Sequence, residues 1–451
     1  MQENARFSDN ESSAREQPYS MRNLIVIAGL IVAMFGQDSG KTVRHHRVAV
    51  EDATLTPELV QAESALEKRD LSTAESLLKT VTSRDPANYR AWFDLGFLYN
   101  AQGKSEDSIA AYRQSVTAKN DVFESNLNLG LMLAKAGKPD AEQFLRAATR
   151  LKPTDHVEEG QARAWLSLGH VLESTKPDEA LTAYRMASSL QPKDPEPHLS
   201  AGPLLEKQNK YAEAEQEYRQ ALAKDPNSPE ALIGIANIYM RGTRFIEAAE
   251  TLRKLVAQRP DYGPGHIQLA RVMAAEKKFE EAIPEFQAGL KLNPADKDAQ
   301  RDLAEVYASA GKFVDAQLLY EALLGASPND AALHHSLGRA YMKQRKFPQA
   351  QQEFVATLKL KPDFGEAYGD LAMAADQNKD YPTTIRALDV RSKFLPELPA
   401  TYFLRATAYD HLRAYKQAAE NYHLFLQASS GQLPEQEWQA RHRLIAIEPK
   451  K

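Results

Sequence analysis

The sequence contains no cysteine among its 451 residues. Disulfide bonds, thiolate nucleophiles and cysteine-based zinc or iron–sulfur sites are therefore excluded. A dominant charge is also lacking, because 56 Lys and Arg residues oppose 61 Asp and Glu residues, for a formal net charge of −5. Acids and bases are interspersed, without the clustered basic excess that attracts a phosphate backbone. Composition therefore argues against a nucleic-acid partner.

The N-terminal region has only a short apolar run, from Leu24 to Phe35, after a polar stretch and Met21-Arg22-Asn23. A helix of this length covers about 18 Å, well short of the roughly 30 Å hydrocarbon core of a membrane. A basic residue followed by a short apolar run is typical of a signal peptide. We expect residues 21–36 to be a signal peptide or, with recruited flanks, a membrane anchor, and residues 37–54 to be a linker. Residues 1–20 form a polar tail that a start at Met21 would leave untranslated.

This N-terminus predicts an exported or membrane-tethered protein, on the extracytoplasmic side. A cytoplasmic location stays open as the alternative, because Met34 and Gly36 make a poor −3 and −1 pair for signal-peptide cleavage.

Catalytic motifs are also lacking. The segment Gly36 to Thr42, GQDSGKT, resembles a phosphate-binding loop but has one residue too few between its first glycine and the Gly-Lys pair. The zincin, nucleophile-elbow and dinucleotide-binding patterns do not occur. Two pairs of adjacent histidines, His45-His46 and His334-His335, would point about 100° apart on a helix and rarely chelate one metal ion. We predict no enzymatic activity, no cofactor and no metal site.

The sequence does have a regular internal repeat. Prolines recur at intervals of 34 residues, at Pro192, Pro226, Pro260, Pro294, Pro328, Pro362 and Pro396. A fixed period of this size indicates an array of similar supersecondary units. With the proline at place 32 of each unit, the pattern predicts eleven units, which start at residues 55, 89, 123, 162, 195, 229, 263, 297, 331, 365 and 399.

Two places in every unit carry small residues. Place 8 is Gly or Ala throughout, and place 20 is Ala in nine of the eleven units. Large residues surround them, including Trp92 and Trp165 at place 4 and aromatic residues at place 24, such as Tyr218, Phe286, Tyr320, Phe354 and Tyr422. Small residues in each half, within an apolar stripe of helical period, predict two closely packed helices in each unit.

This pattern resembles the tetratricopeptide repeat family, whose motif is clearest at Leu337, Gly338, Tyr341, Ala350 and Phe354. The resemblance implies an all-α fold, a right-handed α-solenoid of about eleven stacked antiparallel helix pairs over residues 55–432. Because the ends of a solenoid need caps, we expect residues 433–451 to form a C-terminal capping helix, with Trp438, Leu444 and Ile447 packed against the last pair. We also expect an insertion at residues 156–161, before Ala162, and a kink at Pro203, which lies inside a first helix.

In this family the first helices line a concave groove, which places 2, 5, 9, 12 and 13 usually face. By that resemblance the N-terminal part of the groove is apolar and suited to anchoring hydrophobic side chains, whereas basic residues further along could meet carboxylates. The predicted partner-binding residues are Phe93, Phe97, Leu127, Leu131, Arg241, Arg271, Arg301, Arg339 and Lys343. The alternative is that the apolar residues pack between helices and the arginines are solvated or paired within the chain.

The favoured function is a scaffold that binds a protein or peptide segment in its groove. The alternative is a regulatory or substrate-presenting subunit of an enzyme complex. A repeat-bearing sugar transferase is disfavoured, because the repeats leave no stretch for a catalytic domain.

Overall fold

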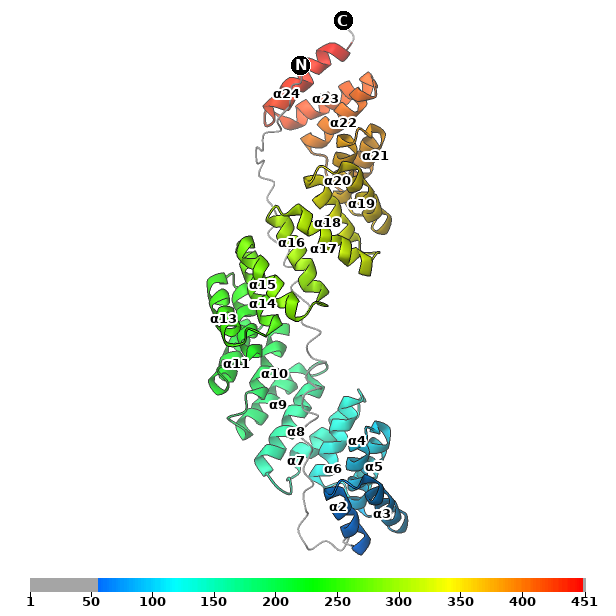
Figure 1. The fold of residues 1–451 in the computed structure, drawn as a ribbon, viewed down its shortest axis with the longest axis vertical. Coiled ribbons are helices and arrows are strands. Elements are labelled where there is room, and N and C mark those ends of the chain that lie inside the picture. Colours follow the sequence, from blue (N-terminus) through cyan, green and yellow to red (C-terminus); the bar gives the residue numbers. More distant parts are fainter. Residues whose placement is uncertain (1–55, 449–451) are drawn as a thin grey trace. The chain divides into compact units, whose positions relative to one another are not determined.

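The computed structural model describes residues 56–448, and Figure 1 shows them as a series of helices. Within that range there are 23 helices and no strand, which confirms the predicted all-helical fold. The predictions for residues 1–54 lie outside the described residues. The chain divides into two compact units, one ending at Arg241 and the other beginning at Gly242.

The first unit contains five complete helix pairs and the first helix of a sixth. Its helices are α2 (Pro57–Glu67), α3 (Leu71–Arg84), α4 (Tyr89–Ala101), α5 (Ser105–Ala118), α6 (Phe123–Lys135), α7 (Ala141–Arg150), α8 (Val157–Leu172), α9 (Pro177–Leu190), α10 (Glu196–Lys207), α11 (Tyr211–Lys224) and α12 (Pro229–Arg241).

The second unit begins with the second helix of the sixth repeat and ends with one additional helix. Its helices are α13 (Phe245–Gln258), α14 (Gly263–Ala275), α15 (Phe279–Leu292), α16 (Lys297–Ser309), α17 (Phe313–Ala326), α18 (Ala331–Lys343), α19 (Phe347–Leu360), α20 (Gly365–Gln377), α21 (Tyr381–Arg391), α22 (Pro399–His411), α23 (Tyr415–Ser429) and α24 (Pro434–Ile447).

The predicted repeat boundaries agree with most helix starts, but not at the fourth repeat. There the expected insertion before Ala162 is itself helical, because α8 begins at Val157, directly after His156 in a left-handed conformation with φ of 46°. Glu158 and Glu159 lie in the first turn of α8, where the helix dipole favours negative charge. The insertion therefore lengthens a helix. Helix α10 continues through Pro203 to Lys207, and the expected kink there stays a prediction.

Within each repeat the two helices meet where place 8 faces place 24. In α18 a Cβ atom added to Gly338 would lie 2.6 Å from the ring of Phe354 in α19, a ring that is fully buried. The glycines at place 8 of other repeats face buried tyrosine rings in the same way, as in the pairs Gly96–Tyr112, Gly169–Tyr184 and Gly202–Tyr218. The small residue thus allows a large aromatic ring to fill the space between the helices.

Successive repeats are joined by a hydrogen bond that the sequence analysis missed. A side chain at place 4 lies beside the backbone carbonyl oxygen six residues earlier, at the loop that ends the preceding repeat. The Trp92 indole donates to Pro86 O at 2.9 Å and the Tyr368 hydroxyl donates to Pro362 O at 3.1 Å. His334 shares this role and also pairs with Glu353 of α19 at 2.6 Å, so one ring connects the loop to both helices of its repeat.

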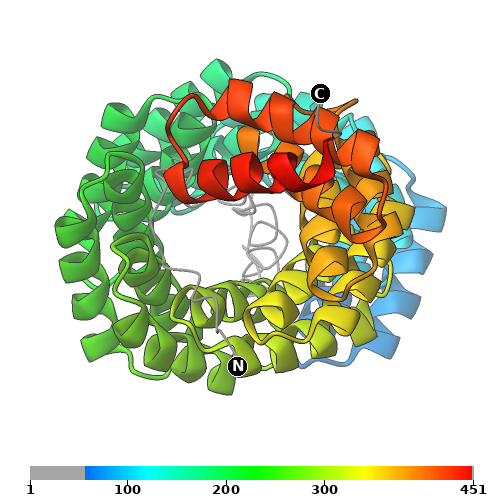
Figure 2. The same ribbon diagram turned by 90° about the horizontal axis from the view of Figure 1, so that it is seen from above.

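The first helices lie on the inner side of each unit. In the first unit α2 contacts α4, α6 contacts α8 and α10 contacts α12, and in the second unit the pairs are α14–α16, α18–α20 and α20–α22. Within either unit, successive second helices of the described chain touch less. A stack whose first helices approach more closely curves toward them, and Figure 2 shows the helices of each unit following a curved path. The first helices therefore line the concave side of each unit.

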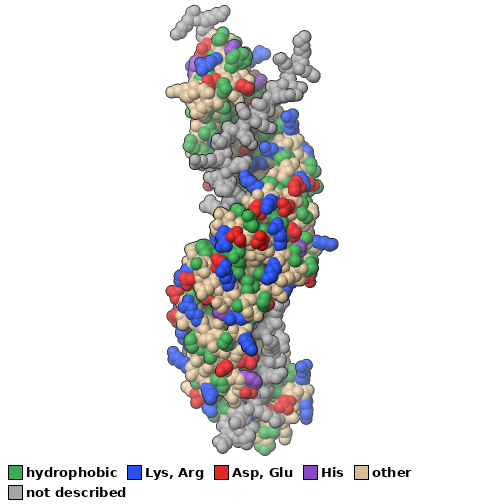
Figure 3. Space-filling view, turned by 90° about the vertical axis from the view of Figure 1, so that its left-hand side faces the viewer, with side chains coloured by type: hydrophobic (Ala, Val, Ile, Leu, Met, Phe, Trp, Pro, Cys, Tyr) green, Lys and Arg blue, Asp and Glu red, His purple; other side chains and the backbone are tan. Residues whose placement is uncertain are grey.

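None of the helices in residues 56–448 combines the length and the apolar character that a membrane span requires. On the face shown in Figure 3, basic and acidic side chains are interspersed.

We predict that Gly338→Leu destabilises the protein by roughly 1–3 kcal/mol, because the new side chain would overlap the Phe354 ring in a filled core. Thermal or urea unfolding of the full chain measures the change. The matched control is Gly325→Leu in α17, where an added Cβ meets nothing within 4 Å and the backbone is helical. Gly311 is a poorer control, because its φ of 77° strains any larger residue. Equal stability of the wild type and Gly338→Leu would show that the assigned packing is wrong.

Candidate functional site

Helix α4, a first helix of the first unit, carries two partly buried phenylalanines. Phe93 is partly buried, and its ring meets the ring of Tyr112 edge-on, with 5.5 Å between the centroids. Phe97 lies one turn further along and is also partly buried. The Phe93 side chain is held by packing and yet retains surface, which are the properties of a preorganised apolar contact.

The next first helix, α6, contributes unequally. Leu127 is only 6% exposed and belongs to the core of the first unit, so its side chain has little surface to offer a partner. Leu131 lies at the edge of the same core and is partly exposed. The side chains of Leu166 in α8 and Leu199 in α10 are partly buried against this core as well. The apolar surface thus continues along successive first helices.

Arg241 ends the first unit in an exposed position. Its guanidinium lies 5.3 Å from the centre of the Tyr211 ring, within the range of a cation–π contact. The partly buried carboxyl of Glu206 accepts a 2.7 Å hydrogen bond from Tyr218, and burial raises its pKa. Arg241 opposes that rise through its charge. This arginine is therefore engaged with its own unit while its side chain faces solvent.

Two of the predicted arginines in the second unit are paired within the chain. Arg271 in α14 donates to Asp302 of α16 at 2.7 Å, and Arg301 in α16 donates to Asp330, the N-cap of α18, at 2.6 Å. Each pair joins successive repeats and is partly buried. For these two arginines the alternative prediction, pairing within the chain, is correct. Arg339 and Lys343 in α18 are instead exposed and have no ion pair among the described residues.

Acidic side chains between these arginines were missed by the sequence analysis. Burial raises the pKa of the Glu305 carboxyl to about 7, and the charge of Asp302 adds to the rise. The pKa of Asp302 is itself raised by burial, although Arg271 opposes this. The first helices of the second unit therefore carry both acids and bases. Opposite charges about one repeat apart, such as Arg271 and Asp302, were the signal available in the sequence.

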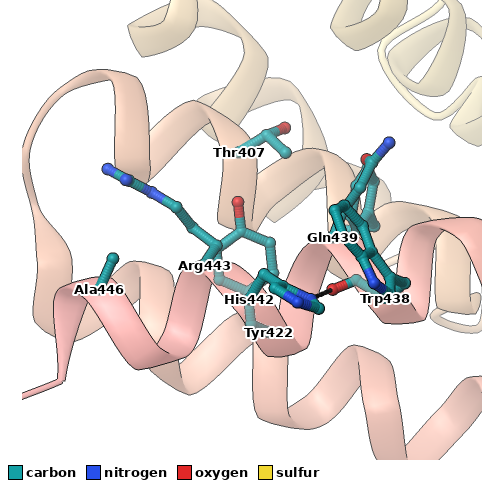
Figure 4. Close-up of a pocket in the computed structure, with 8 residues that line it drawn as sticks. Thr407, Tyr422, Trp438, Gln439, His442, Arg443 and Ala446 are labelled. Atoms are coloured by element: carbon teal, nitrogen blue, oxygen red, sulfur yellow. Dashed lines mark hydrogen bonds between the residues drawn. The ribbon is translucent and has the colours of Figure 1, made fainter.

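A recess of about 340 Å³ lies at the C-terminal end of the second unit, among α22, α23 and α24. Figure 4 shows Trp438 and Arg443 extending from α24 on either side of it, with Thr407 of α22 across from them. The lining residues are Phe403, Thr407, Tyr422, Trp438, Gln439, His442, Arg443 and Ala446. The repeat pattern gives no indication of this site.

The recess corrects one part of the predicted cap. Helix α24 does cover the last pair, since Leu444 is buried and Ile447 packs against the same core. Trp438, however, is 61% exposed, so its ring does not lie beneath the cap as expected. The indole instead packs against His442, one turn later, with 3.9 Å between the ring centroids.

Within residues 56–448, no group of three or more His, Asp or Glu side chains has an arrangement that could hold a metal ion.

Comparison with protein families identifies the repeats. Models described as tetratricopeptide repeat match residues 59–121, 101–156, 205–275, 273–340 and 308–375, which together cover more than half of the chain. The chain belongs to the tetratricopeptide repeat family.

One curated relative, Protein NPGR1 of Arabidopsis thaliana, is 29% identical over 103 residues, which is 22% of this chain. The matched segment spans only 14% of the relative's own length.

Solved structures with tetratricopeptide repeats resemble parts of the chain at low identity. YrrB, described as a protein with an unusual peptide-binding site, is 22% identical, with a TM-score of 0.38, and the match covers 42% of this chain and 96% of YrrB. The C-terminal part of a repeat protein from Cytophaga hutchinsonii is 20% identical, with a TM-score of 0.44, over 52% of this chain and 96% of its own. PilF of Pseudomonas aeruginosa is 18% identical, with a TM-score of 0.39, over 47% and 96%.

For the tetratricopeptide repeats of the second unit, we predict that Glu305→Gln is stabilising at high pH. The folded pKa of about 7 exceeds the usual 4.5, so the bound proton stabilises the fold below pH 4.5, and this stability is lost as the pH rises through 7. Glutamine avoids that loss. We expect a gain of roughly 1–3 kcal/mol at pH 8, reduced by partial exposure to water, and roughly a quarter of that gain at pH 5.

Urea unfolding at the two pH values measures the difference, with the exposed Glu250→Gln in α13 as control. A gain that is the same at pH 5 and pH 8 would contradict the raised pKa.

Proposed function

We propose that this protein is an interaction scaffold that captures a protein or peptide segment on the concave side of its first unit, and that it has no catalytic activity of its own. Tetratricopeptide repeats serve in general as scaffolds for protein–protein interaction, and five family matches lie in this chain. The observation that supports the location is the continuous row of partly exposed apolar side chains on successive first helices, Phe93, Phe97, Leu131, Leu166 and Leu199.

The ligand favoured by this surface is a segment with hydrophobic side chains. Large apolar residues in fixed positions provide most of the energy of protein interfaces, because burying them removes water at little cost in side-chain entropy. The Phe93 ring is already held against Tyr112, and Leu131, Leu166 and Leu199 against the core. Binding therefore needs little rearrangement of this face.

The cations have different roles in this proposal. Arg339 and Lys343 are exposed and lie on one first helix of the second unit, where they would add charge complementarity for an acidic segment. Arg271 and Arg301 contribute less, because a ligand carboxylate would have to compete with Asp302 and Asp330.

We also propose that the protein acts in the cell envelope, exported or tethered through residues 21–36. The support is the sequence Met21-Arg22-Asn23 followed by the apolar run. Cell fractionation and N-terminal sequencing of the mature chain test it: removal or membrane retention of this segment is expected, and an intact chain in the cytoplasm would contradict it.

The test of the binding face is affinity capture from the native cell envelope with the full chain, followed by quantitative mass spectrometry. We expect the double variant Phe93→Ala/Phe97→Ala to recover at least about tenfold less of the specific partner, because both anchors are lost. Circular dichroism melting must show that the double variant is folded, since Phe93 also packs against Tyr112.

The matched control is Met186→Ala, which removes an apolar side chain 40% exposed on the second helix α9. It should leave capture unchanged. If the folded double variant captures the same proteins in the same amounts as the wild type, the concave face of the first unit is not the binding surface.

A further inference from the structure

Helix α24 presents an unusual surface for the terminal helix of a repeat stack. A terminal helix is expected to have a polar outer face, because no further repeat covers it. In α24 the face toward the stack is filled by Leu444, Ala440 and Ile447, and yet Trp438 is 61% exposed beside the recess. The indole ring is apolar but is not buried in the core, so packing of the repeats does not explain its exposed position.

The recess has the size and the lining for one aromatic side chain. A cavity of roughly 150 Å³ can hold a benzene ring, and this recess measures about 340 Å³ and opens to solvent. Phe403 of α22 and Trp438 of α24 both contribute aromatic surface to it. Aromatic rings pack favourably edge-on or offset against such partners. The apolar part of the site therefore favours a Phe, Tyr or Trp side chain.

The charges around the recess favour an acidic neighbour for that side chain. In two ion pairs that involve α24, the acidic side chain is more buried than the basic one. The Glu437 side chain is 9% exposed and that of its partner Arg441 is 64% exposed. The Asp410 side chain is 12% exposed and that of its partner Arg443 is 44% exposed. The two acids are occupied by the chain itself, since Glu437 accepts hydrogen bonds from Ser429 and Gly431. Among the residues that line the recess, the exposed charge is consequently that of Arg443.

Arg443 is held in a fixed position at this rim. Its Nε and Nη2 atoms both donate to the Asp410 carboxylate, the second at 2.8 Å, which leaves the Nη1 group outside the pair. His442 is oriented by a 2.9 Å contact of its Nδ1 atom with the backbone carbonyl oxygen of Trp438 (Figure 4). A carbonyl oxygen only accepts, so Nδ1 donates here and Nε2 faces away from this contact. Both side chains are thus preorganised beside the indole.

We propose that the recess among α22, α23 and α24 is a second peptide-binding site, which takes an aromatic side chain flanked by acidic residues. The ring enters between Phe403 and Trp438, and a neighbouring carboxylate meets Arg443. This site lies in the second unit and does not depend on the concave face of the first unit.

The test uses the full chain and a fluorescein-labelled peptide with one phenylalanine between two pairs of glutamates, followed by fluorescence anisotropy. Wild-type protein should bind this peptide, and Trp438→Ala should bind it at least about tenfold more weakly. The fold should tolerate this change because the side chain is largely exposed. The matched control is Ile445→Ala on the same helix, 73% exposed and outside the recess, which should bind as the wild type does.

Two further peptides separate the aromatic and charge contributions. Replacing the phenylalanine by alanine, or the glutamates by lysines, should each abolish measurable binding, and rising salt should weaken binding of the acidic peptide. Phe93→Ala/Phe97→Ala should leave the affinity unchanged, which separates this site from the concave face of the first unit.

The proposal is overturned if Trp438→Ala binds as tightly as the wild type, if the lysine peptide binds equally well, or if the wild type binds none of the peptides. It is also overturned if sedimentation shows a dimer of wild-type chains that Trp438→Ala abolishes, because the occupant would then be a second copy.

Discussion

Close approach of the two helices within each repeat is the constraint on which the rest of this structure depends. A Gly or Ala at place 8 allows the aromatic ring at place 24 to lie against the backbone of the first helix, as Phe354 does at Gly338. The two helices then pack closely, and the next repeat buries the remaining apolar face of the pair. Place-4 side chains fix the stack by binding the carbonyl group of the preceding loop, as Trp92 does at Pro86. Packing within a repeat and bonding between repeats thus use separate positions of the same 34-residue period.

The curvature of each unit follows from this arrangement and determines which side chains face a partner. First helices of successive repeats touch one another more than second helices do, so they line the concave side. Side chains on these helices that keep exposed surface, such as Phe97 and Arg339, are available for contact, whereas the packing of the helices depends on other positions. Sequence at the concave positions can therefore vary without loss of the fold, as is usual for scaffolds that carry different binding sites.

The fold was largely predictable, because the period marks helix starts such as Tyr89 and Lys297 directly. The repeat period did not predict the helix start at Val157, because the insertion there carries no periodic signal and extends α8. The candidate site was less predictable. Spacing identified Arg271 and Arg301 but did not show that Asp302 and Asp330 neutralise them, because side-chain geometry between repeats decides ion pairing. Hydrophobicity placed Trp438 in the core of the cap, whereas the turn of α24 places its ring at the surface.

The central claim is that partners bind through the first helices, while second helices maintain the stack. Hydrogen–deuterium exchange of the full chain, alone and saturated with a captured partner segment, tests this most directly. The account predicts slower exchange on binding in α4, α6 and α8, with little change in α5, α7 and α9. Protection confined to the second helices would contradict it.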